Sequence, residues 1–343
     1  MARAEAGETP PFGGEAAMRG LSAFEKRLLN TLQTGLPIIE RPYAQIGRVL
    51  NVDERRVLEA TRRLAKRGII RRIGAVINWR AIGKASTLVT ACVPEKKLKK
   101  VVTAVNRLEG VSHNYLREHP FNLWFTLRAG SQSEIKAILT KLSKRFGLEF
   151  HSLPVKRTFK LDVRFDAQSN GRRLLSAERC PLNAVRFPLN VVDNRILERL
   201  QKGLKVTSRP YDFFDDDFEN YDCLLHIAEM LEEGVIYRIG AVVNHHKLGF
   251  VANAMFVCKV SEARVVEVGS SLANLNIVSH CYERYSPAPH AVQGNLFAMM
   301  HGRTQTDIRL TIEDFVKSQG LGKWELLPTV SRLIRPQKRH AKS

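Results

Sequence analysis

The sequence contains two copies of the same set of motifs, and this repeat constrains the fold more than any other feature. Three motifs recur at offsets of 166 to 168 residues: Arg-Pro-Tyr (41–43 and 209–211), Arg-Ile-Gly-Ala-Val (72–76 and 238–242) and Val-Ser-His (111–113 and 278–280). The offset drifts by only a few residues over most of each unit. A chain of 343 residues has room for about two to four small domains, so two matching units of two domains each are expected.

The first part of each unit has the pattern of a helix-turn-helix module. In the first copy, apolar side chains recur at helical spacing from Phe24 to Leu32, and a second short helix is expected after Pro42. A third helix is expected after Asn51, which we interpret as its N-cap. The apolar segment 69–77 then predicts a wing strand, which completes a winged helix-turn-helix domain.

The rest of each unit predicts strands and helices in the order βαββαβ. In the first copy, strands are expected at 87–93, 110–117, 121–128 and 148–155, and helices at 95–108 and 131–146. We therefore predict an α+β chain, a tandem duplication of a winged helix-turn-helix domain plus a ferredoxin-like βαββαβ domain. The predicted boundaries are a disordered leader (1–20), a first pair of domains (21–80 and 81–166), a linker (167–187), a second pair (188–246 and 247–335) and a basic tail (336–343).

The charge of the chain indicates the kind of partner that it binds. A formal net charge of +20 favours a polyanion, which could be nucleic acid or a small molecule with many carboxylates. No apolar run reaches the ~18 residues of a membrane-spanning helix, and the leader lacks the apolar core of a secretory signal. The five cysteines are scattered without a CxxC pair, which argues against a disulfide framework and a zinc site. We expect a cytoplasmic protein with no membrane partner.

The two predicted recognition helices carry opposite charge, which bears on whether the chain reads DNA. The first is basic (Arg55, Arg56, Arg62, Arg63, Lys66 and Arg67), whereas the second holds Glu229, Glu232 and Glu233 and follows three aspartates at 215–217. Because phosphate contacts dominate DNA affinity, an acidic helix would be repelled. We expect both helices to be packing and pairing surfaces and DNA not to be a partner, with contact through the first unit as the open alternative.

A single histidine pair coincides between the repeats, and it belongs to a larger repeated pattern. The pattern Ser-His-x-Tyr-x-Arg places His113, Tyr115 and Arg117 in one unit and His280, Tyr282 and Arg284 in the other. Because alternate residues of a strand share a face, each unit should project an imidazole, a phenol and a guanidinium side by side. An imidazole can move a proton and a guanidinium can hold a carboxylate. A polar network between two packed sheets would explain the same pattern, and this alternative stays open.

These motifs resemble those of the siroheme decarboxylases. The first unit, with Val-Ser-His-Asn-Tyr-Leu-Arg at 111–117 and Asn-Leu-Trp-Phe at 122–125, is similar to one subunit type of that family. The second unit, with Val-Ser-His-Cys-Tyr-Glu-Arg at 278–284 and a longer turn after it, is similar to the partner type. The family shares its two-domain layout with Lrp/AsnC regulators. A chain that carries both types resembles the fused enzyme of haem d1 biosynthesis, whereas an unfused pair serves an alternative route to haem b.

The resemblance implies a carboxy-lyase that converts siroheme to 12,18-didecarboxysiroheme by releasing carbon dioxide from two acetate arms. It implies His113 and His280 as catalytic residues, although one of them could instead ligate the siroheme iron, and no other metal site is expected. The substrate-binding residues that it implies are Arg72, Arg117, Arg238, Arg284, Tyr115 and Tyr282. The macrocycle can accept the electrons that carbon dioxide leaves behind, so no added cofactor is expected.

Some features leave alternatives open. The family's Pro-His-Trp-Pro-Tyr stretch reads Pro-His-Ala-Val-Gln here at 289–293, so the role of His290 is open, and no role is assigned to His301. An Lrp/AsnC-type DNA-binding transcription regulator with an anionic effector, or a tetrapyrrole carrier without activity, would also fit the charge. The tandem units could pair within the chain, and two such chains could then associate as a homodimer.

Overall fold

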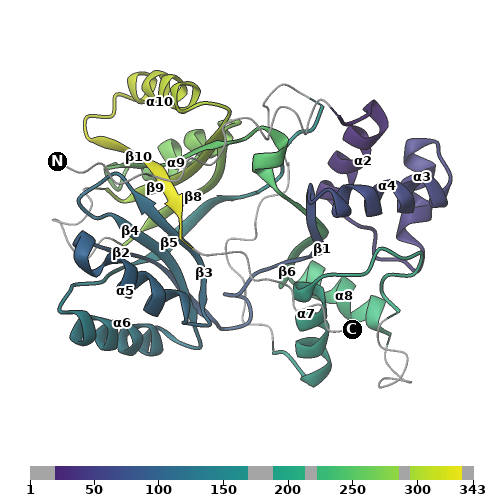
Figure 1. The fold of residues 1–343 in the computed structure, drawn as a ribbon, viewed down its shortest axis with the longest axis horizontal. Coiled ribbons are helices and arrows are strands. Elements are labelled where there is room, and N and C mark those ends of the chain that lie inside the picture. Colours follow the sequence, from purple (N-terminus) through teal and green to yellow (C-terminus); the bar gives the residue numbers. More distant parts are fainter. Residues whose placement is uncertain (1–19, 169–187, 213–221, 286–293, 334–343) are drawn as a thin grey trace.

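The computed structural model describes residues 20–168, 188–212, 222–285 and 294–333, which form the two lobes of Figure 1. One lobe collects the helix-turn-helix parts of both units, and the other collects both ferredoxin-like parts. The predicted basic tail and most of the predicted leader and linker lie outside the described residues, as do the aspartates at 215–217 and His290. Within the described ranges, no helix is long and apolar enough to cross a membrane.

The helical lobe has one core that both units share. Its described helices are α2 (Ala23–Thr34), α3 (Pro42–Leu50) and α4 (Glu54–Lys66) from the first unit and α7 (Val191–Lys202) and α8 (Cys223–Glu232) from the second. Apolar side chains of all five meet in a single buried cluster. Equivalent helices begin alike, because Ser22 and Asn190 each form a capping box with the acidic residue three positions on.

One predicted helix start is wrong. Asn51 does not cap the third helix but ends the second, in the left-handed conformation with φ of 56°. Asparagine tolerates this conformation better than most residues, which explains why the chain turns there. The N-cap of α4 is Asp53, whose carboxylate accepts a hydrogen bond from the Arg56 main-chain N–H at 2.7 Å.

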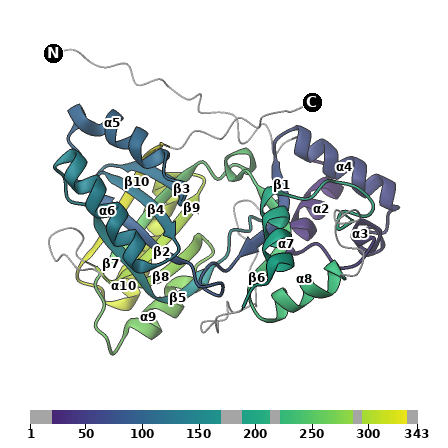
Figure 2. The same ribbon diagram turned by 90° about the horizontal axis from the view of Figure 1, so that it is seen from below.

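The predicted wing strand pairs across the units. β1 (Ile70–Ile77) and β6 (Ile236–Val243) form a two-stranded antiparallel ribbon with Gly74 opposite Gly240. A Cβ at Gly74 would lie 2.2 Å from the Leu200 carbonyl oxygen, and one at Gly240 would lie 2.5 Å from that of Leu32, so both positions require glycine. Figure 2 shows the ribbon on the side of the helical lobe that faces the other lobe. The repeated Ile-Gly-Ala-Val motif therefore joins the two units.

The second lobe is a closed barrel with helices on its outside. The first unit supplies β2 (Ala85–Ala91), α5 (Glu95–Asn106), β3 (Val111–Arg117), β4 (Leu123–Ala129), α6 (Gln132–Phe146) and β5 (His151–Leu161). After the 3-10 turn η1 (His245–Leu248), the second supplies β7 (Ala252–Cys258), α9 (Val265–Asn274), β8 (Val278–Arg284), β9 (Leu296–Gly302), α10 (Gln305–Gln319) and β10 (Trp324–Arg332). The βαββαβ order in each unit confirms the ferredoxin-like prediction.

The last strand of each unit closes the barrel. β5 continues to Leu161, beyond the predicted end at 155, because its second half pairs with β8 up to the Leu161/His280 pair. β10 pairs with β3 in the same way. Around the ring the order is β10-β3-β4-β2-β5-β8-β9-β7, so equivalent strands lie half the ring apart. A half-turn about the barrel axis relates the units, which places His113 and His280 at the same end of the barrel.

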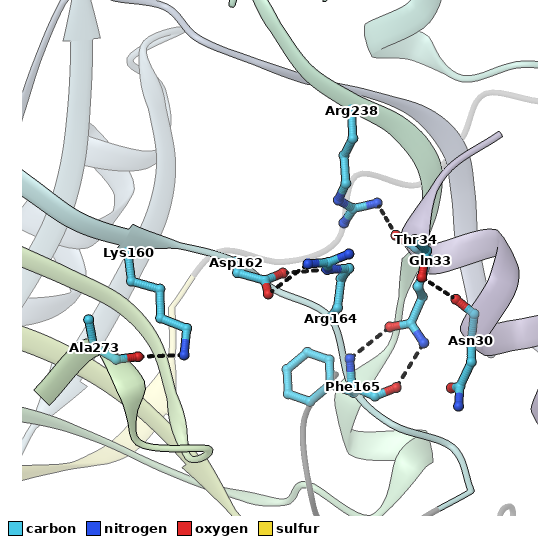
Figure 3. A network of polar contacts seen from close by, with 9 residues as sticks. All are labelled: Asn30, Gln33, Thr34, Lys160, Asp162, Arg164, Phe165, Arg238 and Ala273. Atoms are coloured by element: carbon cyan, nitrogen blue, oxygen red, sulfur yellow. Dashed lines mark hydrogen bonds and ion pairs between the residues drawn. The ribbon is translucent and has the colours of Figure 1, made fainter. Parts of the chain in front are cut away.

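Beyond β5 the chain crosses from the barrel to the helical lobe, as Figure 3 shows. The side chain of Gln33 on α2 accepts a hydrogen bond from the Phe165 N–H at 2.9 Å and donates to the Phe165 carbonyl at 2.8 Å. Asp162 and Arg164 form a buried ion pair at 2.9 Å. Because buried polar groups without partners are costly, these bonds fix the path of this segment between the lobes.

Candidate functional site

In each unit, the repeated imidazole, phenol and guanidinium lie along one face of a strand. On β3, the His113 and Tyr115 rings stack at 6.2 Å between centroids, and the Arg117 guanidinium lies 5.7 Å from the Tyr115 centroid. On β8, the corresponding separations are 6.1 Å and 4.7 Å. The period of two in a strand explains this arrangement, which the sequence predicted.

The guanidiniums of the two triplets point into the barrel. Arg117 donates to the Leu327 carbonyl at 2.7 Å, and Arg284 donates to the Leu153 carbonyl at 2.8 Å. Burial lowers the pKa of each to about 10, so both remain charged at neutral pH. Each triplet therefore runs from the barrel interior, at the arginine, toward the barrel rim, at the histidine. The substrate-binding roles of these arginines and of the two tyrosines stay predictions.

Three other arginines surround His113 at the rim, and the sequence reasoning did not select them. Arg332 on β10 is the cross-strand partner of Tyr115, so its side chain emerges on the face that carries the triplet. Arg128 lies on β4, two residues beyond the cross-strand partner of His113 and on the same face. Arg71 reaches the group from β1 in the helical lobe, and its charge acts on His113. The rim of the barrel is strongly cationic at this point.

These guanidiniums contribute to the lowered pKa of His113. Its side chain is exposed at the rim of the barrel, on the strand face that also carries Tyr115 and Arg117. Desolvation, followed by the charges of Arg332, Arg128 and Arg71, lowers the pKa of His113 to about 4. The imidazole is therefore neutral at pH 7 in the free protein. A polycarboxylate that pairs with the arginines would raise this pKa again.

We expect the free protein to lose thermal stability as the pH falls from about 6.5 toward 4. The pKa of His113 is about 4 in the folded protein, whereas an unperturbed histidine has a pKa of 6.5, so the unfolded chain binds more protons in this window. The contribution of His113 to the free energy of unfolding is complete above pH 6.5 and is lost as the pH decreases toward 4. Melting curves followed by circular dichroism between pH 7 and pH 4 measure it. His113→Gln should show a shallower decrease, and an unchanged slope would contradict the assignment.

Three further imidazoles stand on the second-unit side of the rim. Between ring centroids, His245 lies 4.2 Å from His246, 4.9 Å from His301 on β9 and 5.5 Å from Phe165. Burial, followed by the charges of His246, Arg332 and Arg71, lowers the pKa of His245 to about 3. The charges of Arg332 and Arg71 therefore lower the pKa of both His113 and His245. The two units thus contribute to one site.

Arg72 and Arg238, which begin the repeated Arg-Ile-Gly-Ala-Val motif within β1 and β6, contact the ends of helices in the same lobe. Arg238 donates to the Gln33 carbonyl in the last turn of α2 at 2.9 Å, as Figure 3 shows. Arg72 donates to the Ala75 carbonyl at 3.3 Å and lies against Gly203, which ends α7. Cations near a helix C-terminus interact favourably with its unpaired carbonyls. The substrate-binding roles of Arg72 and Arg238 stay predictions, and their contacts are those of packing residues.

The basic helix α4 uses its arginines for contacts within the chain. Arg62 donates to the Val206 carbonyl of the other unit at 2.8 Å, and Arg63 lies 3.8 Å from the Glu25 carboxylate. These contacts agree with the packing surface that the sequence predicted. The acceptor in the other unit is a main-chain carbonyl. That DNA is not a partner stays a prediction.

The repeated motifs do not include the other rim residues, which is why the sequence reasoning missed them. Arg71, Arg128, Arg332, His245 and His246 correspond in the other unit to Tyr237, His301, Thr158, Trp79 and Arg80. A search for residues kept in both units passes over every one of them. The site therefore combines repeated residues with residues that belong to one unit alone.

Comparison with known proteins places the chain among its relatives. The AsnC-like ligand binding domain matches residues 81–160 and 247–333, and the siroheme decarboxylase NirDL-like HTH domain matches residues 25–71. The siroheme decarboxylase of Hydrogenobacter thermophilus is 32% identical over 306 residues, which cover 88% of this chain and 90% of that protein. The siroheme decarboxylase NirDL subunit of Paracoccus denitrificans is 31% identical over 82% of this chain and 85% of its own length.

Solved structures show the same likeness. The crystal structure of a siroheme decarboxylase NirDL superposes with a TM-score of 0.70 at 30% identity, covering 91% of this chain and 92% of that one. A second NirDL structure, in co-complex with an iron-uroporphyrin III analogue, superposes with a TM-score of 0.69 at 29% identity. Sequence and fold agree over nearly the whole length of both chains. This chain therefore belongs to the siroheme decarboxylase family, as a fused protein of the NirDL type with Lrp/AsnC-like domains.

Proposed function

We propose that this chain removes carbon dioxide from two acetate arms of siroheme and gives 12,18-didecarboxysiroheme. The observation that carries the proposal is the cationic cluster at the barrel rim, where the charges of Arg71, Arg128 and Arg332 act on the exposed His113. Guanidiniums bind carboxylates strongly, and siroheme carries many carboxylates. The relative in co-complex with an iron-uroporphyrin III analogue supports a tetrapyrrole as the ligand of this fold.

The reaction needs a proton donor and an electron sink. Protonation of the ring carbon beside an acetate arm lets the bond between the arm's methylene and its carboxylate break, and the electron pair enters the ring. The exocyclic carbon then takes up a proton and becomes a methyl group, while the ring carbon loses its proton. Each arm thus consumes one proton and releases one carbon dioxide. Because the macrocycle itself is the electron sink, the proposal requires no further cofactor.

His113 and His280 are the proposed acids, and substrate binding would prepare them. In the free protein, desolvation and then the charges of the nearby arginines lower the pKa of His113 and keep it neutral. When substrate carboxylates pair with those guanidiniums, the repulsion that disfavours the imidazolium decreases and His113 can take up a proton. His280 lies at the same end of the barrel, half-buried, with its Nδ1 2.8 Å from the Ser279 hydroxyl. Whether one of the two histidines ligates the siroheme iron remains part of the proposal to be tested.

Incubation of the purified protein with siroheme under anaerobic, reducing conditions tests the activity. Mass spectrometry is expected to show a product lighter by two carbon dioxide molecules, with a singly decarboxylated species at early times. A stable complex whose mass never decreases would favour the carrier function instead. Tight DNA binding in a parallel shift assay at physiological salt, without a spectral change on adding siroheme, would favour the transcription regulator.

The biological setting follows from the fusion and from the thiols. Both subunit types occur in one chain, which favours haem d1 biosynthesis over the alternative route to haem b. The four cysteines of the described ranges are free thiols, and this supports a cytoplasmic location. A homodimer of the chain stays a prediction, for which light scattering of the purified protein is the direct measurement.

A further inference from the structure

We propose that His246, His245 and His301 form a relay that carries protons from solvent to the decarboxylation site. The inference rests on the proposed function and deepens it, because it assigns a role to three imidazoles that are not part of the repeated triplets. None of the three has a histidine at the equivalent position of the first unit, where Arg80, Trp79 and Arg128 stand.

The three rings form a continuous line that leads inward. The centroids of His246 and His245 are 4.2 Å apart, and those of His245 and His301 are 4.9 Å apart. His246 is exposed, His245 is half-buried, and His301 is only 6% exposed. Phe165 contacts both inner rings, at 5.5 Å from His245 and 5.3 Å from His301, and restrains their positions. A proton that enters at His246 therefore meets successively more buried imidazoles.

The inner end of the line lies beside a proposed acid. On β9, Met299 is the cross-strand partner of His280, and His301 is two residues further along the same strand. Residues two apart on a strand share a face, so His301 and His280 project from adjacent strands into the same space. Diagonal neighbours of this kind are about 7–8 Å apart, within reach of two imidazoles joined by one water molecule.

The chemistry of the site requires such a supply. Each arm consumes one proton, and the guanidiniums of Arg71 and Arg332 repel hydronium and cationic buffer from the open side of the rim. A neutral imidazole accepts a proton on one nitrogen and releases one from the other, so it conducts without keeping a charge. Among the described residues, Nε2 of His245 has no hydrogen-bond partner, which leaves it available to a proton or a bridging water.

The surroundings of the three rings are those of a relay and not of a metal centre. The charged and titratable groups that act on the pKa of His245 are His246 of η1, Arg332 of β10 and Arg71 of β1. Within the described ranges, no group of three or more His, Cys, Asp or Glu side chains is arranged to hold a metal ion. Desolvation and then the charge of Arg332 also lower the pKa of His246, so the outer rings stay neutral and hold a proton only while it passes.

Single-turnover kinetics with siroheme test the relay. His245→Ala is expected to lower the rate of carbon dioxide release at least about tenfold, with the siroheme Kd unchanged within about twofold. Free imidazole in the buffer should restore much of the rate, because it can occupy the space that the side chain leaves. His246→Gln, at an exposed position, should make the rate depend on buffer concentration. His151→Gln removes a histidine at the opposite end of β5 and should behave as wild type.

Each other outcome overturns the relay. Unchanged rates in a folded His245→Ala, or a decrease that imidazole does not reverse, would show that no proton passes through this ring. A weakened Kd that accounts for the whole loss would make His245 a binding residue. If circular dichroism shows His245→Ala unfolded, His246→Gln decides, and a rate independent of buffer then removes the proposal. A wild-type protein that releases no carbon dioxide overturns the proposed function itself, and the relay with it.

Discussion

His113→Ala is expected to lower the rate of carbon dioxide release from siroheme by a factor of about 10²–10⁴, the usual contribution of a positioned acid. The side chain is exposed at the cationic rim, so its loss removes the proposed donor without removing a side chain of the buried core. The fold should persist, because an alanine on β3 keeps the strand pairing with β4 and β10. Carbon dioxide release and product mass measure the effect, and circular dichroism checks the fold.

The equivalent change in the second unit completes the test. His280→Ala should lower the rate by a similar factor, since the half-turn about the barrel axis brings both rings to the same end. His119→Ala is the matched control. His119 follows the end of β3 that is opposite to His113, and its Nε2 lies 3.0 Å from the Glu325 carboxylate. Wild-type rates in both His113→Ala and His280→Ala would remove these histidines from the mechanism.

Arg332→Gln and Arg71→Gln should each weaken siroheme binding by about 10–100-fold. A hydrogen bond to a charged group contributes about 1.5–3 kcal/mol, and each 1.4 kcal/mol changes Kd tenfold. Both arginines are exposed at the rim and act on His113 and His245, so they are positioned to hold carboxylates between the units. An absorbance titration with siroheme, repeated at two salt concentrations, measures Kd and its ionic component.

The control for the two arginine variants makes the same change of charge at a surface position outside the rim. Arg309→Gln removes an exposed guanidinium on α10, whose nearest acidic partner is Glu313 one turn away, and should leave Kd near the wild-type value. If Arg309→Gln weakened binding as much as the rim variants, only the net charge of the protein would matter. An unchanged Kd in Arg332→Gln and Arg71→Gln would place the carboxylates elsewhere, with Arg117 and Arg284 as the remaining predicted residues.

The repeat, the element order and the two triplets could be predicted from the sequence because each depends on local periodicity. A strand places alternate side chains on one face whatever it pairs with, so His113, Tyr115 and Arg117 had to lie together. The positions of the helices follow likewise from apolar spacing and caps. The N-cap prediction at Asn51 was wrong because Asn51 and Asp53, two residues apart, can each cap a helix. Asn51 ends α3 and Asp53 begins α4.

Only the tertiary structure decided how the units combine. The extension of β5 to Leu161 depends on its partner β8, which lies more than a hundred residues away, so no local pattern marks its end. The site at the rim likewise joins Arg71, His245 and Arg332 from distant segments, and none of them belongs to a repeated triplet. Barrel closure places Arg332 beside the first triplet, and the packing of the two lobes adds Arg71, so tertiary contacts and not sequence spacing set which side chains become neighbours.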